Sequence, residues 1–301
     1  MSIATLLVEL FTEELPPKVL KKLGDAFESK LRMELVDRGF VSEDDDVIGS
    51  TESGEFIATT LASSRRLAAV IPRVLAIAPD QVFTEKLMPV SVGLDRDGNA
   101  TPALVKKLKA KSLSHLTPAG LVRESDGKAD QLVYRGVAKG QSLQVALQAA
   151  LEAAIADLPV PKVMSYQLAD GKTTVQFVRP AHGLVALHGS QIVPVHALGL
   201  VAGRVTHGHR FQGATDIELQ HAGEYETRLE KEGGVIASFD KRRAEIMRLL
   251  FAHAEQTGDT LGEPEDYEAL LDEVTGLVER PTVYVGKFDT EFLEEIGRAH
   301  V

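Results

Sequence analysis

Six of the arginine and histidine side chains between positions 179 and 210 form the densest polar group of the sequence, in a region otherwise made of short apolar runs and glycine-containing turns. They are Arg179, His182, Arg204, His207, His209 and Arg210. Arginine binds phosphate oxygens through two parallel hydrogen bonds, and a neutral imidazole donates a further one. A cationic surface for RNA phosphates is therefore one chemistry that these residue types favour.

The histidines of this region allow two other interpretations. His207 and His209 are two residues apart, so a strand would place both imidazoles on one face, with His182, His188 or His196 as a third metal ligand. A metal-dependent hydrolase could be built on such a triad. Alternatively, the imidazoles hydrogen-bond backbone groups at tight turns, for which Gly208 and Gly213 supply unusual conformations. The residues alone leave these alternatives open.

A second cationic group occupies the segment SFDKRRAEI, which begins at Ser238. Asp240 is typical of a helix N-cap, and Lys241, Arg242 and Arg243 would then fill the first helical turn. Cations at that position oppose the helix dipole, and a bound phosphate would relieve the repulsion. A solvated basic turn paired with acidic neighbours is the alternative.

Composition and missing motifs restrict the possible functions. The 301-residue chain has a net charge of −11, no cysteine and no tryptophan, which excludes disulfides and thiolate chemistry and requires any RNA contact to be local. Phosphate-binding glycine loops and the nucleophile elbow are also missing. The carboxylates of ELFTEELPP could form an acid–base pair, although acids at a helix start are the simpler interpretation. No apolar run reaches the roughly 18 residues of a membrane span, so we expect a cytoplasmic protein with no membrane segment.

The elements that position these residues are predicted from hydrophobic spacing. A strand at 5–10 precedes a helix whose stripe runs from Leu20 to Leu35 and which Gly39 terminates. β-Branched and small apolar residues predict strands near 55–62 and 66–79. Leucines at helical spacing predict a helix after Ser142, short strands are predicted between 173 and 220, and helices at 240–255 and 265–278. This pattern favours an α+β fold with mixed or antiparallel sheets and packed helices.

Proline and glycine punctuation predicts two successive α+β units. The first covers residues 1–158, with a possible internal boundary at 94–102, and the second covers residues 159–295 with the FVRPAHG and THGHRF segments. Residues 296–301, IGRAHV, interrupt a helical pattern and are predicted to be a non-native tail.

Five segments together resemble one known family in its own order. They are LLVELFTEELPPK from Leu6, LPVPKVMSYQ from Leu158, FVRPAHGLVALHG from Phe177, LGLVAGRVTHGHRF from Leu198 and LLDEVTGLVERPTVYVGKFDTEFL from Leu270. In these segments the chain is similar to the amino-terminal part of the β subunit of bacterial two-subunit glycyl-tRNA synthetases.

The resemblance implies an enzyme of two α and two β subunits that joins glycine to tRNA(Gly) at the expense of ATP. ATP and Mg²⁺ are expected on the α subunit, and the β subunit is expected to bind tRNA and the α subunit without catalytic residues in this part. The tRNA-binding candidates are Arg179, His182, Arg204, His207, His209, Arg210, Lys241, Arg242 and Arg243. The rivals are an editing-like metal-dependent hydrolase that uses His182, His207 and His209, and a structural scaffold without RNA contact.

Overall fold

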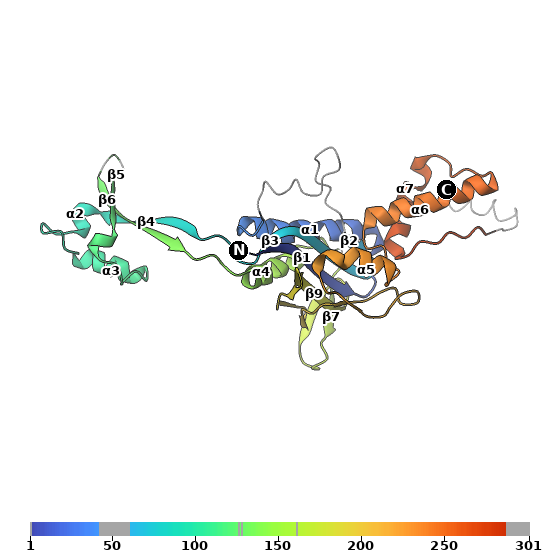
Figure 1. Ribbon diagram of the computed structural model, residues 1–301, viewed down its shortest axis with the longest axis horizontal. Helices are drawn as coiled ribbons and strands as arrows, with labels where there is room; N and C mark the ends of the chain where they lie inside the picture. The colour runs from blue at the N-terminus through green and yellow to red at the C-terminus, as the bar shows by residue number, and fades with distance from the viewer. Residues whose placement is uncertain (1, 42–60, 126, 128, 161, 287–301) are drawn as a thin grey trace. The chain divides into compact units, whose positions relative to one another are not determined.

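The computed structural model describes residues 2–41, 61–125, 127, 129–160 and 162–286 (Figure 1). Most of the predicted strand near 55–62 and all of the predicted tail at 296–301 lie outside these residues. The chain divides into a larger unit, Met1–Ala76 with Ser142–Val301, and a smaller unit, Ile77–Gln141. The combination of helices with antiparallel sheets confirms the α+β fold class.

The larger unit is built on a five-stranded antiparallel sheet with the strand order β10-β9-β1-β3-β2. Its strands are β1 (Ile3–Thr12), β2 (Leu61–Ser63), β3 (Arg66–Leu75), β9 (Ala181–His188) and β10 (Gln191–Ile192). β1 pairs with β3 on one side and with β9 on the other, so segments from both sides of the predicted boundary at 158 share one sheet. The unit therefore differs from the predicted division, which hydrophobic spacing could not resolve because strand pairing is not local.

Two helices cover one face of this sheet. α1 (Leu20–Asp37) buries the predicted stripe completely and contacts β3 and β2, and Gly39 follows it with a φ of 75°. α4 (Leu143–Ala156) packs against α1, and its predicted stripe residues Leu147 and Leu151 are buried. Both helices therefore confirm the helical spacing seen in the sequence.

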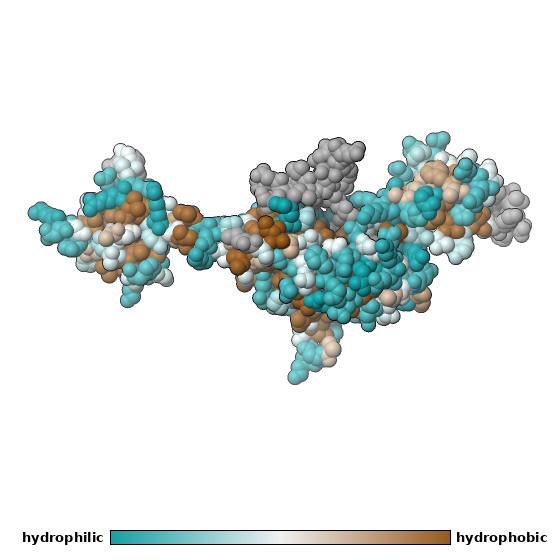
Figure 2. All heavy atoms as spheres, in the orientation of Figure 1, coloured by the Kyte–Doolittle hydropathy of each residue, from teal (hydrophilic) through white to brown (hydrophobic). Residues whose placement is uncertain are grey.

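The opposite face carries a second apolar cluster. Leu7, Val185 and Leu187 of the sheet belong to one buried apolar cluster with residues from the segment that follows Val201. That segment contains β13 (Val205–Thr206), β14 (Ile217–Glu218), the 3-10 helix η4 (Ala222–Glu224) and α5 (Tyr225–Lys231). Since side chains alternate along a strand, Glu9 and Phe11 share the face of Leu7. The charged residue Glu9 thus points into this apolar layer. The outer surface of α5 is hydrophilic (Figure 2).

The remaining elements of the larger unit surround the sheet. They are the 3-10 helix η1 (Pro17–Val19), the hairpin β7 (Met164–Gln167) with β8 (Thr174–Phe177), the hairpin β11 (His196–Ala197) with β12 (Leu200–Val201), α6 (Phe239–Thr257) and α7 (Pro264–Leu277). α7 packs against η1 and α6. Across the described parts of the chain, no helix is both long and apolar enough to cross a membrane.

The smaller unit has its own sheet and core. β4 (Gln81–Pro89), β6 (Asp130–Ala138) and β5 (Val122–Ser125) form an antiparallel sheet in the order β4-β6-β5, with α2 (Val90–Gly93), α3 (Pro102–Ala110) and the 3-10 helix η3 (Pro118–Gly120). Leu87, Leu94, Leu104, Leu108 and Leu132 form the core. The predicted boundary at 94–102 is instead a turn inside this unit, in which the Asp95 carboxylate accepts the backbone N–H groups of Asp97 and Asn99.

Candidate functional site

Three of the predicted tRNA-binding residues meet at one end of the central sheet. Thr12, at the end of β1, pairs with Ala181 at the start of β9, and Glu13 N–H donates to Pro180 O at 2.9 Å. This pairing brings the residues after β1 and the residues around the start of β9 together with residues from the loop after β13. We call the group the strand-end cluster, and its members are Glu13, Glu14, Arg179, His182 and Arg210.

Glu13 and Glu14 contact the other three side chains of the strand-end cluster. His182 Nε2 lies 2.9 Å from Glu13 Oε1, and Arg210 Nη2 lies 3.7 Å from Glu14 Oε1 and 4.0 Å from Glu13 Oε2. Arg179 donates from Nε to the Glu14 carbonyl at 2.9 Å. The hydrogen bond from His182 lowers the pKa of Glu13, and the positive charges of Arg65 and Arg210 act in the same direction. Glu13 is therefore ionised at neutral pH. The sequence had predicted Glu13 and Glu14 in the first turn of a helix, but both lie between β1 and η1.

The other two predicted histidines are engaged locally. His207 Nδ1 lies 2.8 Å from Asp216 Oδ1 and 3.1 Å from Thr215 O, and its ring lies 4.7 Å from that of Phe11. His209 Nδ1 accepts the backbone N–H of Phe211 at 3.2 Å. Within the described ranges, no group of three His, Asp or Glu side chains is arranged to hold a metal ion. The geometry supports the turn-forming interpretation of His209 and gives no support to a metal-dependent hydrolase.

Arg204 and the helix-start cations lie elsewhere and have structural partners. Arg204 donates to the Leu219 and Ser190 carbonyls at 3.3 and 3.1 Å. Lys241 Nζ lies 2.8 Å from Glu226 Oε2, and Arg243 Nε lies 2.6 Å from Asp272 Oδ1. These side chains attach α6 and the segment after β12 to neighbouring elements, and the geometry gives no support to the predicted phosphate site.

The prediction that Arg242 binds tRNA is wrong, because its side chain is completely buried. The guanidinium donates to the carbonyls of Ile236 at 2.6 Å, Ala62 at 2.8 Å and Thr275 at 2.9 Å. Burial lowers the pKa of Arg242 to about 10, so the side chain stays charged at neutral pH. The helix also begins earlier than predicted, since Ser238 and not Asp240 is the N-cap and accepts the Lys241 N–H. Arg242 therefore cannot reach an RNA phosphate in this structure.

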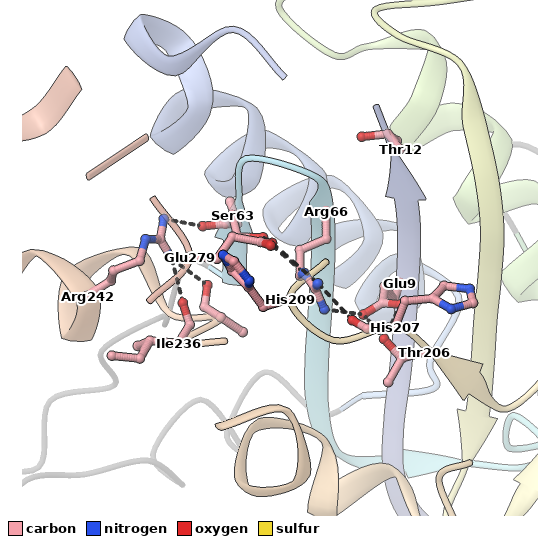
Figure 3. A network of polar contacts seen from close by, with 12 residues as sticks. Glu9, Thr12, Ser63, Arg66, Thr206, His207, His209, Ile236, Arg242 and Glu279 are labelled. Carbon is pink, nitrogen blue, oxygen red and sulfur yellow. Dashed lines mark hydrogen bonds and ion pairs between the residues drawn. The ribbon is translucent and has the colours of Figure 1, made fainter. Parts of the chain in front are cut away.

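Figure 3 shows a buried polar network centred on Arg66, with Glu9 and Glu279 as its carboxylates. The sequence analysis did not predict this network. Arg66 is completely buried, with its Nη1 3.7 Å from Glu9 Oε2 and its Nη2 3.3 Å from Glu279 Oε1. Glu9 also accepts hydrogen bonds from Thr206 Oγ1 at 2.7 and 2.9 Å and from the Tyr225 hydroxyl. Burial, together with the Glu9 charge, raises the pKa of Tyr225, so its hydroxyl remains a donor. One signal was available: Glu9 interrupts an apolar strand.

Arg66 also connects this network to the loop after β13. Its Nη2 donates to the His207 carbonyl at 2.9 Å, and its Nε donates to Ser63 Oγ at 2.9 Å. Ser63 in turn donates to Glu279 Oε1 at 2.6 Å. The backbone from which His209 and Arg210 project is thus fixed to β3 and to the segment after α7.

Comparison with known proteins identifies the family to which this arrangement belongs. A family model described as "Glycyl-tRNA synthetase beta subunit" matches residues 6–295. The chain belongs to the glycyl-tRNA synthetase β-subunit family. The match includes the strands of the central sheet, the strand-end cluster and the buried network.

Curated relatives carry the same name. The chain is 52% identical to the glycine–tRNA ligase β subunit of Dechloromonas aromatica (strain RCB), over 97% of this chain and 41% of the relative. It is 53% identical to that of Delftia acidovorans (strain DSM 14801 / SPH-1) and 55% identical to that of Thiobacillus denitrificans (strain ATCC 25259 / T1), over 98% of this chain and 40% of each relative. The chain thus spans about 40% of the length of these members of the glycyl-tRNA synthetase β-subunit family.

Proposed function

We propose that this chain is the tRNA-binding and α-contacting part of a glycine–tRNA ligase β subunit. In this proposal it supports the ATP-dependent attachment of glycine to tRNA(Gly) in the cytoplasm, in an enzyme of two α and two β subunits. ATP and Mg²⁺ belong to the α subunit. The observation that carries the proposal is the family match over residues 6–295.

Reconstitution tests this division of labour directly. We expect glycine-dependent charging of tRNA when full-length α and β subunits are combined, and loss of charging when either is omitted. Charging by the β subunit alone would contradict the proposal.

The strand-end cluster is the surface through which we propose that the chain contacts tRNA phosphates. His182 and Arg210 are about half exposed, with 48% and 50% of their side-chain surface accessible. The Arg210 ion pairs are long, and exposed pairs of this kind contribute only about 0–1 kcal/mol. A phosphate can therefore replace a carboxylate as the partner of Arg210 at little cost.

Charge reversal at Arg210 is the sharpest test of this surface. Arg210→Glu removes one cation and adds an anion beside Glu13 and Glu14, so we expect weaker tRNA binding. Loss of one phosphate contact should also reduce the slope of log K against log salt by about 1. The measurement is tRNA affinity of the α–β complex over a range of salt concentrations.

Arg248→Glu is the matched control, because Arg248 is 64% exposed on α6 and pairs with Glu245 at 2.7 Å. The variant changes the net charge of the complex by the same amount. Equal weakening by the two variants would show a general charge effect and no contact at Arg210. Unchanged tRNA affinity in Arg210→Glu, with α association intact, would favour a scaffold.

A further inference from the structure

Phe211 is one of the most exposed large apolar side chains in the described part of the larger unit, with 85% of its surface accessible, beside Tyr284 at 88% and Val201 at 78%. It follows Arg210 in the loop between β13 and β14. The neighbouring ring of His209 lies 6.2 Å away at an interplanar angle of 62°. A phenylalanine in water forgoes the stabilisation of burial, so its position requires an explanation.

The backbone holds this loop in one conformation through close contacts between glycines. His209 N–H donates to Gly233 O at 2.7 Å, and Gly208 N–H donates to Ala214 O at 3.0 Å. A Cβ at Gly213 would lie 1.9 Å from Gly233 O, and a Cβ at Gly208 would lie 2.4 Å from Ala214 O. Because neither approach is possible with a side chain, the two glycines allow the crossing that fixes the loop. These backbone contacts join the two ends of the loop, and Phe211 lies in the exposed part between them.

The surroundings of Phe211 are polar and include one cation, Arg210. Arg210 precedes it, Gln212 follows it and is exposed, and His209 lies beside its ring. Proteins that bind single-stranded nucleic acid combine exposed aromatic rings, on which bases stack, with cations that contact the backbone. The pairing of exposed Phe211 with Arg210 has this arrangement.

We propose that Phe211 stacks on an unpaired base of the bound tRNA, while Arg210 meets an adjacent phosphate. This inference rests on the proposed function and specifies what the strand-end cluster recognises. Every base has a flat face, so the contact selects an unstacked nucleotide and not a sequence. It also identifies a stacking position that the low aromatic content of the chain, 5%, did not indicate.

Three substitutions in the full-length α–β complex separate stacking from apolar contact. Phe211→Ala should weaken tRNA binding about 5- to 150-fold, the effect of losing one base–aromatic stack. Phe211→Leu keeps an apolar side chain but no ring, so we expect it to bind nearly as weakly as the alanine variant. Phe211→Trp should bind more tightly than either. Val201→Ala, at another exposed apolar side chain (78%), is the control that should match the wild type.

Each outcome decides the proposal. Wild-type tRNA affinity in Phe211→Ala, or equal affinity of the leucine variant and the wild type, would overturn it. Weaker association with α and unchanged tRNA affinity would show that Phe211 is a protein anchor, which also overturns it. Glycine-dependent ATP–pyrophosphate exchange reports whether each complex holds an intact α subunit. If the wild-type complex does not charge tRNA, the proposed function itself fails; if it charges and Phe211 has no effect, only this inference fails.

Discussion

At the residue scale, Arg66 joins four segments that are far apart in the sequence. It contacts Glu9 of β1, Ser63 of β2, the His207 carbonyl and Glu279 after α7. Burying these charges costs desolvation free energy, so the complete network need not stabilise the fold more than an apolar core would. What it provides is a defined position for each segment, because the buried guanidinium needs its carboxylate and hydrogen-bond partners in place.

Replacing Arg66 alone should therefore strongly lower the free energy of unfolding. Arg66→Met keeps much of the side-chain volume but leaves Glu9 and Glu279 buried without their cation, so we expect a loss of about 3–5 kcal/mol in the free energy of unfolding. Chemical denaturation measures this loss. The same substitution at exposed Arg248 is the control, with an expected change within about 0.5 kcal/mol. A similar small change at Arg66 would show that the network contributes little.

The sequence revealed the residue types of the candidate site but not their partners. Arg179, His182 and Arg210 were identified because cations and imidazoles are visible in any sequence. Their pairing with Glu13 and Glu14 was not, because it depends on β9 lying beside β1, a contact across more than half of the chain. Arg242 was misplaced for the opposite reason: its charge suggested a surface, whereas a set of backbone carbonyls accommodates it in the interior.

At the element scale, α1 shows which features local spacing can predict. Its apolar stripe and its Gly39 terminus were both identified, since they depend on residues within a few turns of each other. The same helix buries Glu28, with 6% of its surface exposed, next to Phe27 on the packed face. Arg32 Nε lies 3.2 Å from Glu28 Oε1 and compensates part of that burial.

α1 therefore carries two glutamates with opposite linkage between pH and stability. Burial raises the pKa of Glu28 above its usual value of 4.5, despite the attraction of Arg32. The free energy of unfolding that Glu28 contributes is present below pH 4.5 and is lost as the pH rises through the raised pKa. Glu28→Gln should gain stability relative to the wild type as the pH increases from 4.5 to 7, which urea unfolding at several pH values measures.

Glu34 on the same helix is the matched comparison for Glu28. The hydrogen bond from Arg38, followed by that from Lys30, lowers the pKa of Glu34. Its contribution is present above pH 4.5 and is lost as the pH falls through the lowered pKa, so Glu34→Gln should lose stability relative to the wild type as the pH rises towards 4.5. Identical pH profiles for the two variants would contradict the assignment of Glu28 as a buried acid.

At the scale of the whole molecule, the two units differ in charge and have separate cores. Residues 77–141 contain ten Lys and Arg against seven Asp and Glu, although the complete chain has a net charge of −11. The lysines of α3 flank the buried Leu104 and Leu108, as an amphipathic helix requires. The sequence analysis predicted neither the strands nor the separate core of this unit, and it placed the main boundary at 158, because proline-rich stops end an element whether or not a unit ends there.

The ends of the larger unit that flank the smaller one lie side by side. Leu143 N–H donates to Ala76 O at 2.9 Å, so the end of β3 and the start of α4 are adjacent without the intervening residues. Replacement of residues 77–141 by a short glycine linker should therefore preserve cooperative unfolding of the larger unit. We expect a melting temperature within about 4 °C of the parent, since a loop closure of this kind changes stability by about 1 kcal/mol.

Removal of α4 provides the contrasting control for this excision. Leu143–Ala156 buries Leu147, Ala150 and Leu151 against the rest of the larger unit, so its deletion exposes apolar surface that the linker variant leaves covered. Calorimetry should show a cooperative transition for the linker variant and none for the α4 deletion. If the linker variant also loses its transition, the larger unit depends on residues 77–141 to fold, and the separation of the two cores does not extend to their stability.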